Sequence, residues 1–263
     1  MSDFLSFDTL SLHAGQTLDS EFGSRAQPIH QTTSYVFTDT DTASSLFNLE
    51  RGGHVYNRIS NPTVGVLEQR VAALEGGSAS VCVSSGMSAV FCALTALVSQ
   101  GDHVVASANM YGGNISLLKN TLPRFGITAT FVDPTDIKQI ESAIQENTKI
   151  IFGELIGNPG LSVMDIEAVS KICSKHHLPL MIDGTFNTPY LCRCFEYGAN
   201  IIVHSLTKWM GGHGTSIGGV VVDGGNFDWG KDDKFPTLTE AYAPFTGINF
   251  WEEFGPSAFA TRI

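Results

Sequence analysis

The chain between residues 79 and 203 alternates between short apolar runs and longer segments whose apolar residues recur at helical spacing. A short run of bulky residues bounded by turn residues is typical of a buried strand, whereas apolar residues three and four positions apart indicate a helix. Strands that alternate with helices in this way form α/β folds, in which a mostly parallel sheet is sandwiched by helices. We predict strands at 79–83, 103–106, 127–132, 149–155, 179–183 and 200–203, and helices at 86–98, 113–125, 136–145 and 165–176.

Residues 1–60 follow neither pattern, because short polar and turn-like pieces alternate there without a sustained period. We expect an extended N-terminal arm, and a structureless stretch of this length suggests that the arm packs on a neighbouring subunit. A helix is predicted to follow, since Asn61 can cap it, Pro62 suits its first turn and Gly76 can end it. Residues 61–235 would then form the α/β domain, and residues 236–263 would begin a linker to a further domain.

The composition is that of an ordinary globular protein: 43% of the 263 residues are hydrophobic and 16% are charged. This length suffices for one large domain or two modest ones. The formal net charge of -11 argues against nucleic acid or an anionic membrane as a partner, since both repel an acidic surface. The N-terminus lacks a basic region followed by an apolar one, and no apolar run approaches ~20 residues, so we expect a cytoplasmic protein without a membrane span.

The five cysteines do not predict a metal centre. Cys82, Cys92 and Cys173 lie in apolar contexts and are typical of small core residues. Cys192 and Cys194 have two histidines nearby in the sequence, but their spacing matches no common zinc pattern. We therefore expect reduced thiols and no bound metal.

Residues able to do chemistry follow several of the predicted strands. In a parallel sheet the ligand site lies beyond the carboxyl ends of the strands, so these residues should meet at one edge. They are the small-residue turn Ser84–Ser88, Tyr111, Asn158, Asp183, Ser205, Thr207 and Lys208. Taken singly, these residues have ordinary structural explanations: the small turn could be a helix cap, Tyr111 a core aromatic and Asp183 a turn former. Their coincidence at one edge favours a shared site.

Lys208 follows a buried apolar run and precedes glycine-rich turns and a second apolar run at 219–222. An ammonium is costly to desolvate, and desolvation lowers the pKa of a lysine toward the neutral amine that Schiff-base chemistry needs. Ser205 and Thr207 lie on one side of an extended chain and could hold an anion beside the lysine. The alternative is an exposed loop lysine among turn residues, which the other groups at the same edge disfavour.

A lysine, a phosphate cradle, a stacking ring and a carboxylate are the groups that pyridoxal 5'-phosphate (PLP) requires. Lys208 would bind its aldehyde carbon, Asp183 would pair with the pyridinium nitrogen, and Tyr111 would stack on the ring. The phosphate would be held by the free amides of a helix N-terminus and by hydroxyl groups. The residues of that cradle are Ser85, Gly86, Met87, Ser205 and Thr207.

Five motifs, in the same order along nearly the whole chain, resemble those of the Cys/Met-metabolism PLP-dependent enzymes. They are Tyr56-x-Arg58-x-x-Asn61-Pro62-Thr63, the small-residue turn from Ser84 to Ala89, Asn109-Met110-Tyr111-Gly112-Gly113, Ile156-Gly157-Asn158-Pro159, and His204-Ser205-x-Thr207-Lys208 with the glycine-rich turn after it. The Ile-Gly-Asn-Pro motif and the stretches 189–193 and 218–229 are similar to the O-acetylhomoserine sulfhydrylase branch of that family.

This resemblance implies the large domain of a fold type I PLP-dependent transferase. It implies that Tyr56 and Arg58 reach across a dimer interface in a homotetramer, with Arg58 on the phosphate of the neighbour's cofactor, and that Asn158 contacts the ring oxygen of PLP. The implied reaction is γ-replacement on an O-acyl-homoserine, in which acetate leaves and sulfide or a thiol adds to give homocysteine or a thioether. Lys208, Tyr111 and Tyr56 would be catalytic, with Lys208 moving protons as base and acid.

The sequence departs from the family pattern at Gly184, where the family has Asn, and at Leu155 and Cys194, where the branch has Ser and Pro. Gly184 is expected to loosen the turn that aims Asp183. These changes leave the native substrate open, and cystathionine γ-synthase or γ-lyase activity is an alternative. Family members also carry a C-terminal domain that supplies an arginine for the substrate carboxylate, and we expect this chain to lack it. A truncated, non-catalytic remnant is therefore a further alternative.

Overall fold

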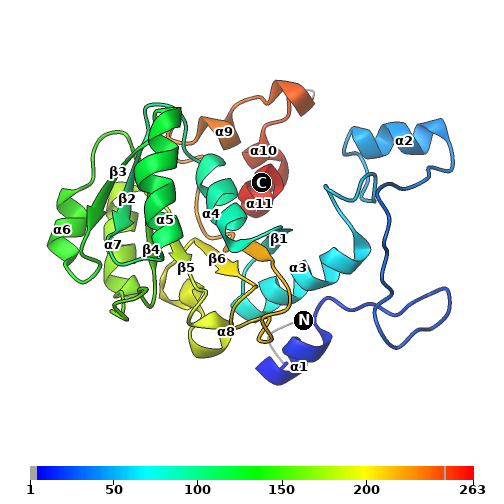
Figure 1. The fold of residues 1–263 in the computed structure, drawn as a ribbon. Coiled ribbons are helices and arrows are strands. Elements are labelled where there is room, and N and C mark those ends of the chain that lie inside the picture. Colours follow the sequence, from blue (N-terminus) through cyan, green and yellow to red (C-terminus); the bar gives the residue numbers. More distant parts are fainter. Residues whose placement is uncertain (1–4, 246) are drawn as a thin grey trace.

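The structure is a computed structural model that describes residues 5–245 and 247–263. Within these residues seven strands form one sheet, in the order β1-β7-β6-β5-β4-β2-β3 (Figure 1). The strands are β1 (Ala79–Val83), β2 (His103–Ser107), β3 (Thr128–Val132), β4 (Thr148–Glu154), β5 (Leu180–Asp183), β6 (Ile201–Ser205) and β7 (Gly219–Asp223). The pairs from β3 through β2, β4 and β5 to β6 are parallel. The predicted mostly parallel α/β sheet is confirmed.

The last strand, β7, runs antiparallel to both of its neighbours, β1 and β6. The chain between β6 and β7 is therefore a reversing connection rather than a helical crossover, and it spans residues 206–218. Ser205 at the end of β6 pairs with Gly219 at the start of β7, so the connection leaves and re-enters the sheet at one point. Lys208 lies on this connection, at the carboxyl edge of the parallel strands.

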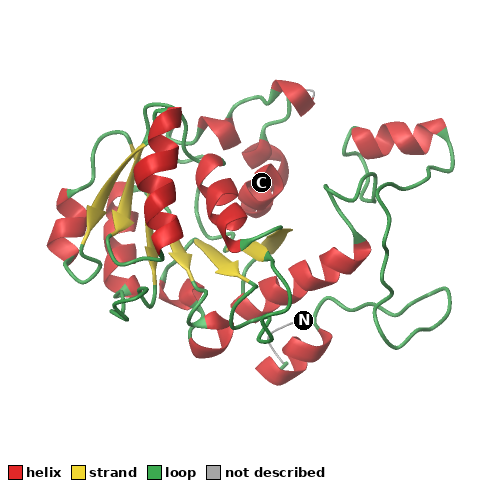
Figure 2. Ribbon diagram, viewed as in Figure 1, coloured by secondary structure: helices red, strands yellow, loops and turns green. Residues whose placement is uncertain are grey.

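Helices cover both faces of the sheet (Figure 2). They are α1 (Phe7–His13), α2 (Thr40–Phe47), α3 (Pro62–Glu75), α4 (Gly86–Thr95), α5 (Gly112–Ser116), α6 (Ile137–Ser142), α7 (Ile166–His176), α8 (Thr188–Leu191), α9 (Pro236–Thr239), α10 (Phe250–Phe254) and α11 (Ala258–Arg262). The helix predicted at 113–125 begins as α5 and continues through a π turn (Leu117–Thr121) and a 3-10 turn (Leu122–Phe125). The expected cap of α3 is present, since the Asn61 side chain accepts a hydrogen bond from the Thr63 amide at 2.8 Å.

Two hydrophobic cores lie on opposite faces of the sheet. One contains residues of α4 and of the C-terminal helices, and the other contains residues of α3, α6 and α7. Adjacent residues of β2 serve different cores, with Val104 in the first and Val105 in the second. Because strand side chains alternate in direction, a strand buried on both faces must be apolar throughout, which explains the unbroken apolar runs in the sequence.

The N-terminal arm differs from the expected extended chain, because it contains α1 and α2. Both helices have a side-chain cap: Ser6 accepts from the Thr9 amide at 3.3 Å, and Asp39 accepts from the Thr42 amide at 2.6 Å. None of the described residues up to residue 60 is buried. In Figure 1 the part of the arm that carries α2 projects away from the sheet.

The residues after 235 pack against the first core. Leu238, Phe250 and Phe259 are buried there, in one cluster with residues of α4. The division into an arm (1–60), an α/β domain (61–235) and the start of a linker (236–263) stays a prediction. Within the described residues, each helix is too short or too polar to span a membrane.

Candidate active site

A cavity of about 390 Å³ lies where the parallel strands end and α4 begins. It gathers every residue that the sequence assigned to the PLP site except Tyr56 and Arg58. Those residues are Ser85, Gly86, Met87, Tyr111, Asn158, Asp183, Ser205, Thr207 and Lys208. Glu154, Ile156, Thr185, Phe186 and Ile217 complete the lining. The rule that ligand sites lie beyond the carboxyl ends of parallel strands thus places these side chains in one cavity.

The N-terminus of α4 forms one wall of this cavity. Ser85 caps the helix by accepting from the Ser88 amide at 3.1 Å, and the first intrahelical hydrogen bond runs from the Ala89 amide to Ser85. The amides of Gly86 and Met87 precede that bond and are the unpaired donors of a helix start. A Cβ on Gly86 would lie 2.6 Å from Cβ of Ser205, so only glycine lets the helix approach the end of β6. The cavity in front of this helix start fits a phosphate group.

Lys208 and Thr207 differ from their sequence-based expectations in one respect each. Lys208 is exposed rather than buried as we expected, because burial ends with His204 and the lysine lies on the connection beyond it. The Thr207 hydroxyl accepts from the Gly218 amide at 3.1 Å and lies 3.3 Å from the carbonyl oxygen of the same residue. It therefore links the two legs of the β6–β7 connection while it lines the cavity.

Asp183 is held at the end of β5 by hydrogen bonds to both of its carboxylate oxygens. The amide and hydroxyl of Thr185 donate to Oδ1, at 3.0 and 2.6 Å. Nδ2 of Asn114 donates to Oδ2 at 3.2 Å. The carboxylate thus has a fixed direction at the cavity wall, as a partner for a ring nitrogen requires.

The sequence analysis missed Glu154, which lines the cavity, and Asn114, which donates a hydrogen bond to it. Glu154 accepts hydrogen bonds at Oε1 from the Tyr111 amide (2.7 Å) and from Nδ2 of Asn114 (3.1 Å). Burial, and next the negative charge of Asp183, raise the pKa of Glu154 to about 7. Glu154 could have been predicted from its place at the end of a predicted strand. Nothing in the sequence indicates its contact with Asn114.

The three departures from the family pattern lie outside the cavity lining. Leu155 and Cys194 are buried in the second core. Gly184 is held by its backbone, because its amide donates to the Val203 carbonyl and its carbonyl accepts from the Thr188 amide, both at 2.9 Å. The expected loosening of the turn is therefore not seen, and Thr185 rather than residue 184 fixes Asp183.

Tyr56 and Arg58 lie on the arm and do not line the cavity of their own chain. The guanidinium carbon of Arg58 lies 5.5 Å from the centre of the Tyr56 ring, so the two side chains form a cation–π pair. Their predicted contact with a neighbour's cofactor stays a prediction.

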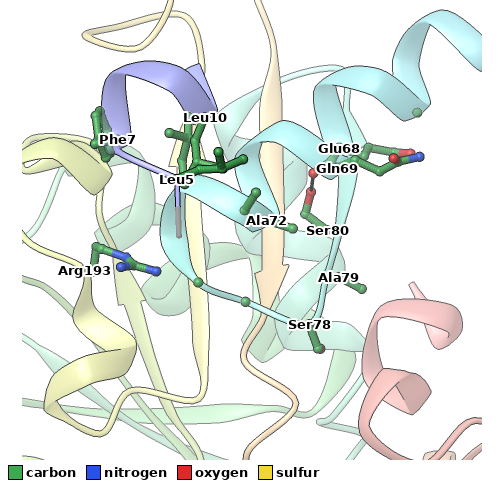
Figure 3. A pocket seen from close by; sticks show the side chains of 15 residues that line it. Leu5, Phe7, Leu10, Glu68, Gln69, Ala72, Ser78, Ala79, Ser80 and Arg193 are labelled. Atoms are coloured by element: carbon green, nitrogen blue, oxygen red, sulfur yellow. Dashed lines mark hydrogen bonds between the residues drawn. The ribbon is translucent and has the colours of Figure 1, made fainter. Parts of the chain in front are cut away.

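A second cavity, of about 840 Å³, lies between α1, α3, β1 and Arg193 (Figure 3). Its charged groups already have partners: Oε1 of Glu68 accepts from the Cys82 amide at 2.9 Å, and Arg193 forms an ion pair with Glu196 at 3.1 Å. None of the predicted site residues lines it. We therefore place the candidate site in the cavity at the sheet edge.

Comparisons with known proteins find related enzymes. The family described as Cys/Met metabolism PLP-dependent enzyme matches residues 8–249. The chain is 49% identical to the O-acetyl-L-homoserine sulfhydrylase of Leptospira meyeri over 94% of its own length and 56% of the relative's. It is also 49% identical to the homocysteine synthase of Schizosaccharomyces pombe, over 97% of the chain and 60% of the relative. The chain thus spans less than two thirds of the length of these relatives.

Solved structures give the same result for the fold. The crystal structure of a putative O-acetylhomoserine (thiol)-lyase from Campylobacter jejuni, which carries N'-pyridoxyl-lysine-5'-monophosphate, superimposes with a TM-score of 0.94 at 37% identity, over 97% of this chain and 63% of that one. A cystathionine gamma-lyase from Lactobacillus plantarum superimposes with a TM-score of 0.77 at 34% identity, over 83% of this chain and 55% of that one. The predicted fold type I large domain is confirmed.

Proposed function

We propose a function for this chain from the premise that it belongs to the family of Cys/Met metabolism PLP-dependent enzymes. The proposed function is γ-replacement on an O-acyl-homoserine, which releases acetate and adds sulfide or a thiol to give homocysteine or a related thioether. The observation that carries it is the cavity in which Lys208, Asp183, Tyr111 and the N-terminus of α4 meet. The O-acetyl-L-homoserine sulfhydrylase and the homocysteine synthase support this reading over a γ-lyase, because each is 49% identical to the chain and the γ-lyase is 34% identical.

The cofactor of this family is PLP, which, when bound, supplies an aldehyde that joins to amines and a ring that withdraws electrons from the substrate carbon. The residues present fit it. The start of α4 lines the cavity together with Ser205 and Thr207, which fits a phosphate, and the fixed carboxylate of Asp183 would hold a proton on the ring nitrogen. Tyr111 is half exposed at the cavity and is free to stack on the ring.

Lys208 would anchor the cofactor and, once released by the substrate amine, carry protons between substrate carbons as base and acid. Its place on the reversing connection suits this role, because Lys208 lines the cavity from a backbone held at Ser205, whose carbonyl accepts from the Lys208 amide at 3.2 Å. Asn158 would contact the ring oxygen. Tyr111 and Tyr56 are the other proposed catalytic residues.

A second copy of the chain is part of the proposal. Leu18, Ile29 and Val36 on the arm are more than four-fifths exposed, so the arm offers apolar side chains that a neighbouring chain could cover. An arm laid on a neighbour would cover them and would bring Tyr56 and Arg58 to the neighbour's cavity. We propose a homo-oligomer built in this way, in the cytoplasm, where the five free thiols stay reduced.

The first test is cofactor capture by the purified chain. PLP added to the protein should give a visible absorption band that borohydride fixes, whereas Lys208→Ala should give none and the surface variant Lys231→Ala should behave as wild type. Capture is the better first readout because the chain spans only 56–60% of the length of its relatives. A folded wild type that stays colourless would contradict the proposal and favour the non-catalytic alternative.

The second test separates the candidate reactions. O-acetylhomoserine is offered with sulfide, with cysteine or with a simple thiol, and cystathionine is offered alone. The proposed function predicts product with sulfide or the simple thiol. Turnover of cystathionine alone, or a clear preference for cysteine, would favour the γ-lyase or γ-synthase alternative.

A further inference from the structure

Glu154 and Asp183 form a pair of acids at the cavity. They are the last residues of β4 and β5, and they lie opposite each other in the register of these parallel strands. Residues matched across parallel strands point to the same face of a sheet, so the two carboxyl groups lie near each other. Two neighbouring acids are costly unless something mediates between them or one of them holds a proton.

The side chain of Asn114 mediates between the two acids. Its Nδ2 donates to Oε1 of Glu154 at 3.1 Å and to Oδ2 of Asp183 at 3.2 Å. Glu154 is 7% exposed and Asn114 is 1% exposed, so water does not compete for these contacts. The Asn114 oxygen has no hydrogen-bond partner among the described residues. The orientation of its amide is therefore set by the two acids alone.

The same Glu154 oxygen also fixes the residue that would stack on the cofactor. It accepts from the Tyr111 amide at 2.7 Å, at the point where the chain turns into α5. Tyr111 has no side-chain hydrogen bond of its own as the cap of that helix, and its ring is half exposed. The hydrogen bond to Glu154 thus fixes the backbone from which the ring extends.

We propose that Glu154 is a positioning residue of the PLP cavity, which holds Tyr111 directly and Asp183 through Asn114 in the directions that the cofactor needs. This inference rests on the proposed function, because those directions matter only if PLP binds here. A protonated Glu154 still accepts both hydrogen bonds at Oε1. It then leaves Asp183 as the single negative charge that faces one pyridinium.

The groups that face Glu154 decide when it ionises. The titratable side chains that line the cavity with it are Asp183 on β5, Tyr111 before α5 and Lys208 after β6. Burial and Asp183 raise the pKa of Glu154 to about 7, so the acid changes charge close to neutral pH. A glutamine, which is neutral and keeps the acceptor oxygen, is therefore the closest mimic of the protonated side chain.

The test compares Glu154→Gln and Glu154→Ala in the full chain, with Glu141→Gln as the control, because Glu141 lies on α6 and pairs at the surface with Lys175. PLP is titrated, and the bound cofactor is followed by its induced circular dichroism, which reports the tilt of the ring independently of turnover. Glu154→Gln should keep the wild-type circular dichroism and an affinity within about threefold. Glu154→Ala should lose at least about tenfold in affinity and most of the induced signal.

A pH series gives a readout that a merely structural role would not move. Between about pH 6 and pH 8, on either side of the pKa of Glu154, the affinity of the wild type for PLP should change with pH. The affinity of Glu154→Gln should not show this change, because glutamine does not titrate. If Glu154→Ala does not fold, Asn114→Leu removes the two hydrogen bonds that join Glu154 to Asp183 and leaves the Tyr111 anchor, so it should lose part of the induced signal.

The outcomes separate this proposal from the proposed function. Wild-type circular dichroism and affinity in Glu154→Ala or Asn114→Leu would overturn the positioning role while PLP binding stands. Glu154→Gln as impaired as Glu154→Ala would also overturn it, because the acceptor oxygen would then not be what matters. A wild type that binds no PLP would end both proposals together.

Discussion

A single buried contact explains why Gly184 carries no side chain. A Cβ at this position would lie 2.6 Å from Cε1 of His204. The imidazole is itself fixed, because its Nε2 lies 2.5 Å from Oε1 of Glu75 and both side chains are fully buried. In a close-packed interior such a ring can move only if its neighbours move with it.

Replacing Gly184 by the family's usual Asn should therefore destabilise this chain. Forcing extra atoms into a packed site costs about 1–3 kcal/mol of the free energy of unfolding. Urea unfolding measures this loss. Gly65→Ala is the matched control, since a Cβ on Gly65 meets open space and alanine favours its helix, α3. A Gly184→Asn variant as stable as wild type would mean that the His204 ring gives way.

The sequence predicted most of the cavity residues but not the contacts among them. Lys208, Asp183 and Tyr111 could be found because each follows a recognisable strand. Asn114 could not, since it joins Glu154 and Asp183 from positions 40 and 69 residues away. The exposure of Lys208 could not be predicted from the sequence either. The apolar run before it suggested burial, but burial ends at the end of the strand.

At the scale of secondary structure elements, Asp223 ties the last helix to the sheet. It ends β7, and its Oδ2 accepts from the Ala260 amide in the first turn of α11 at 3.1 Å, while Oδ1 accepts from the Gly225 amide at 2.9 Å. Asp223 is buried, and burial raises its pKa from 3.8 to about 6. Burying this carboxylate costs free energy, but its two oxygens accept specific backbone hydrogen bonds, one of them from the first turn of α11.

The burial of this carboxylate makes the stability of the fold depend on pH. The folded state holds the Asp223 proton more tightly than the unfolded state does. The free energy of unfolding therefore contains the full contribution of this proton below about pH 4 and loses it as the pH rises to about 6. The loss amounts to at most about 3 kcal/mol. Asp223→Asn should remove this part of the pH dependence in urea unfolding series. If the free energy of unfolding changed with pH equally in the wild type and in the variant, Asp223 would not be the source of this pH dependence.

The elements themselves were predicted to different degrees. The strands of the sheet were found because double-sided burial leaves unbroken apolar runs. The helices α1 and α2 were missed because each is short and buries nothing, so no apolar period marks it. Only their caps, Ser6 and Asp39, could have indicated them.

At the scale of the whole molecule, contacts within a single chain do not explain the conformation of the arm. Val36 is 99% exposed, and the described residues of the arm contribute nothing to the two cores. Such a surface fits a symmetric contact in which each subunit lays its arm on the other. Under that arrangement each cavity would combine Lys208 of one subunit with Arg58 of the next.

Mixed subunits test this arrangement directly. Lys208→Ala lacks the anchor but offers an intact arm, and Arg58→Ala keeps the anchor but offers a weakened arm. Each variant alone should fail to hold PLP tightly. After unfolding and refolding together in equal amounts, random pairing should restore tight, borohydride-fixed binding at about a quarter of all sites, because half of the dimers are mixed and each has one complete cavity. Recovery that stays at the level of the separate variants would show that Arg58 serves its own chain or none, and the shared cavity would have to be abandoned.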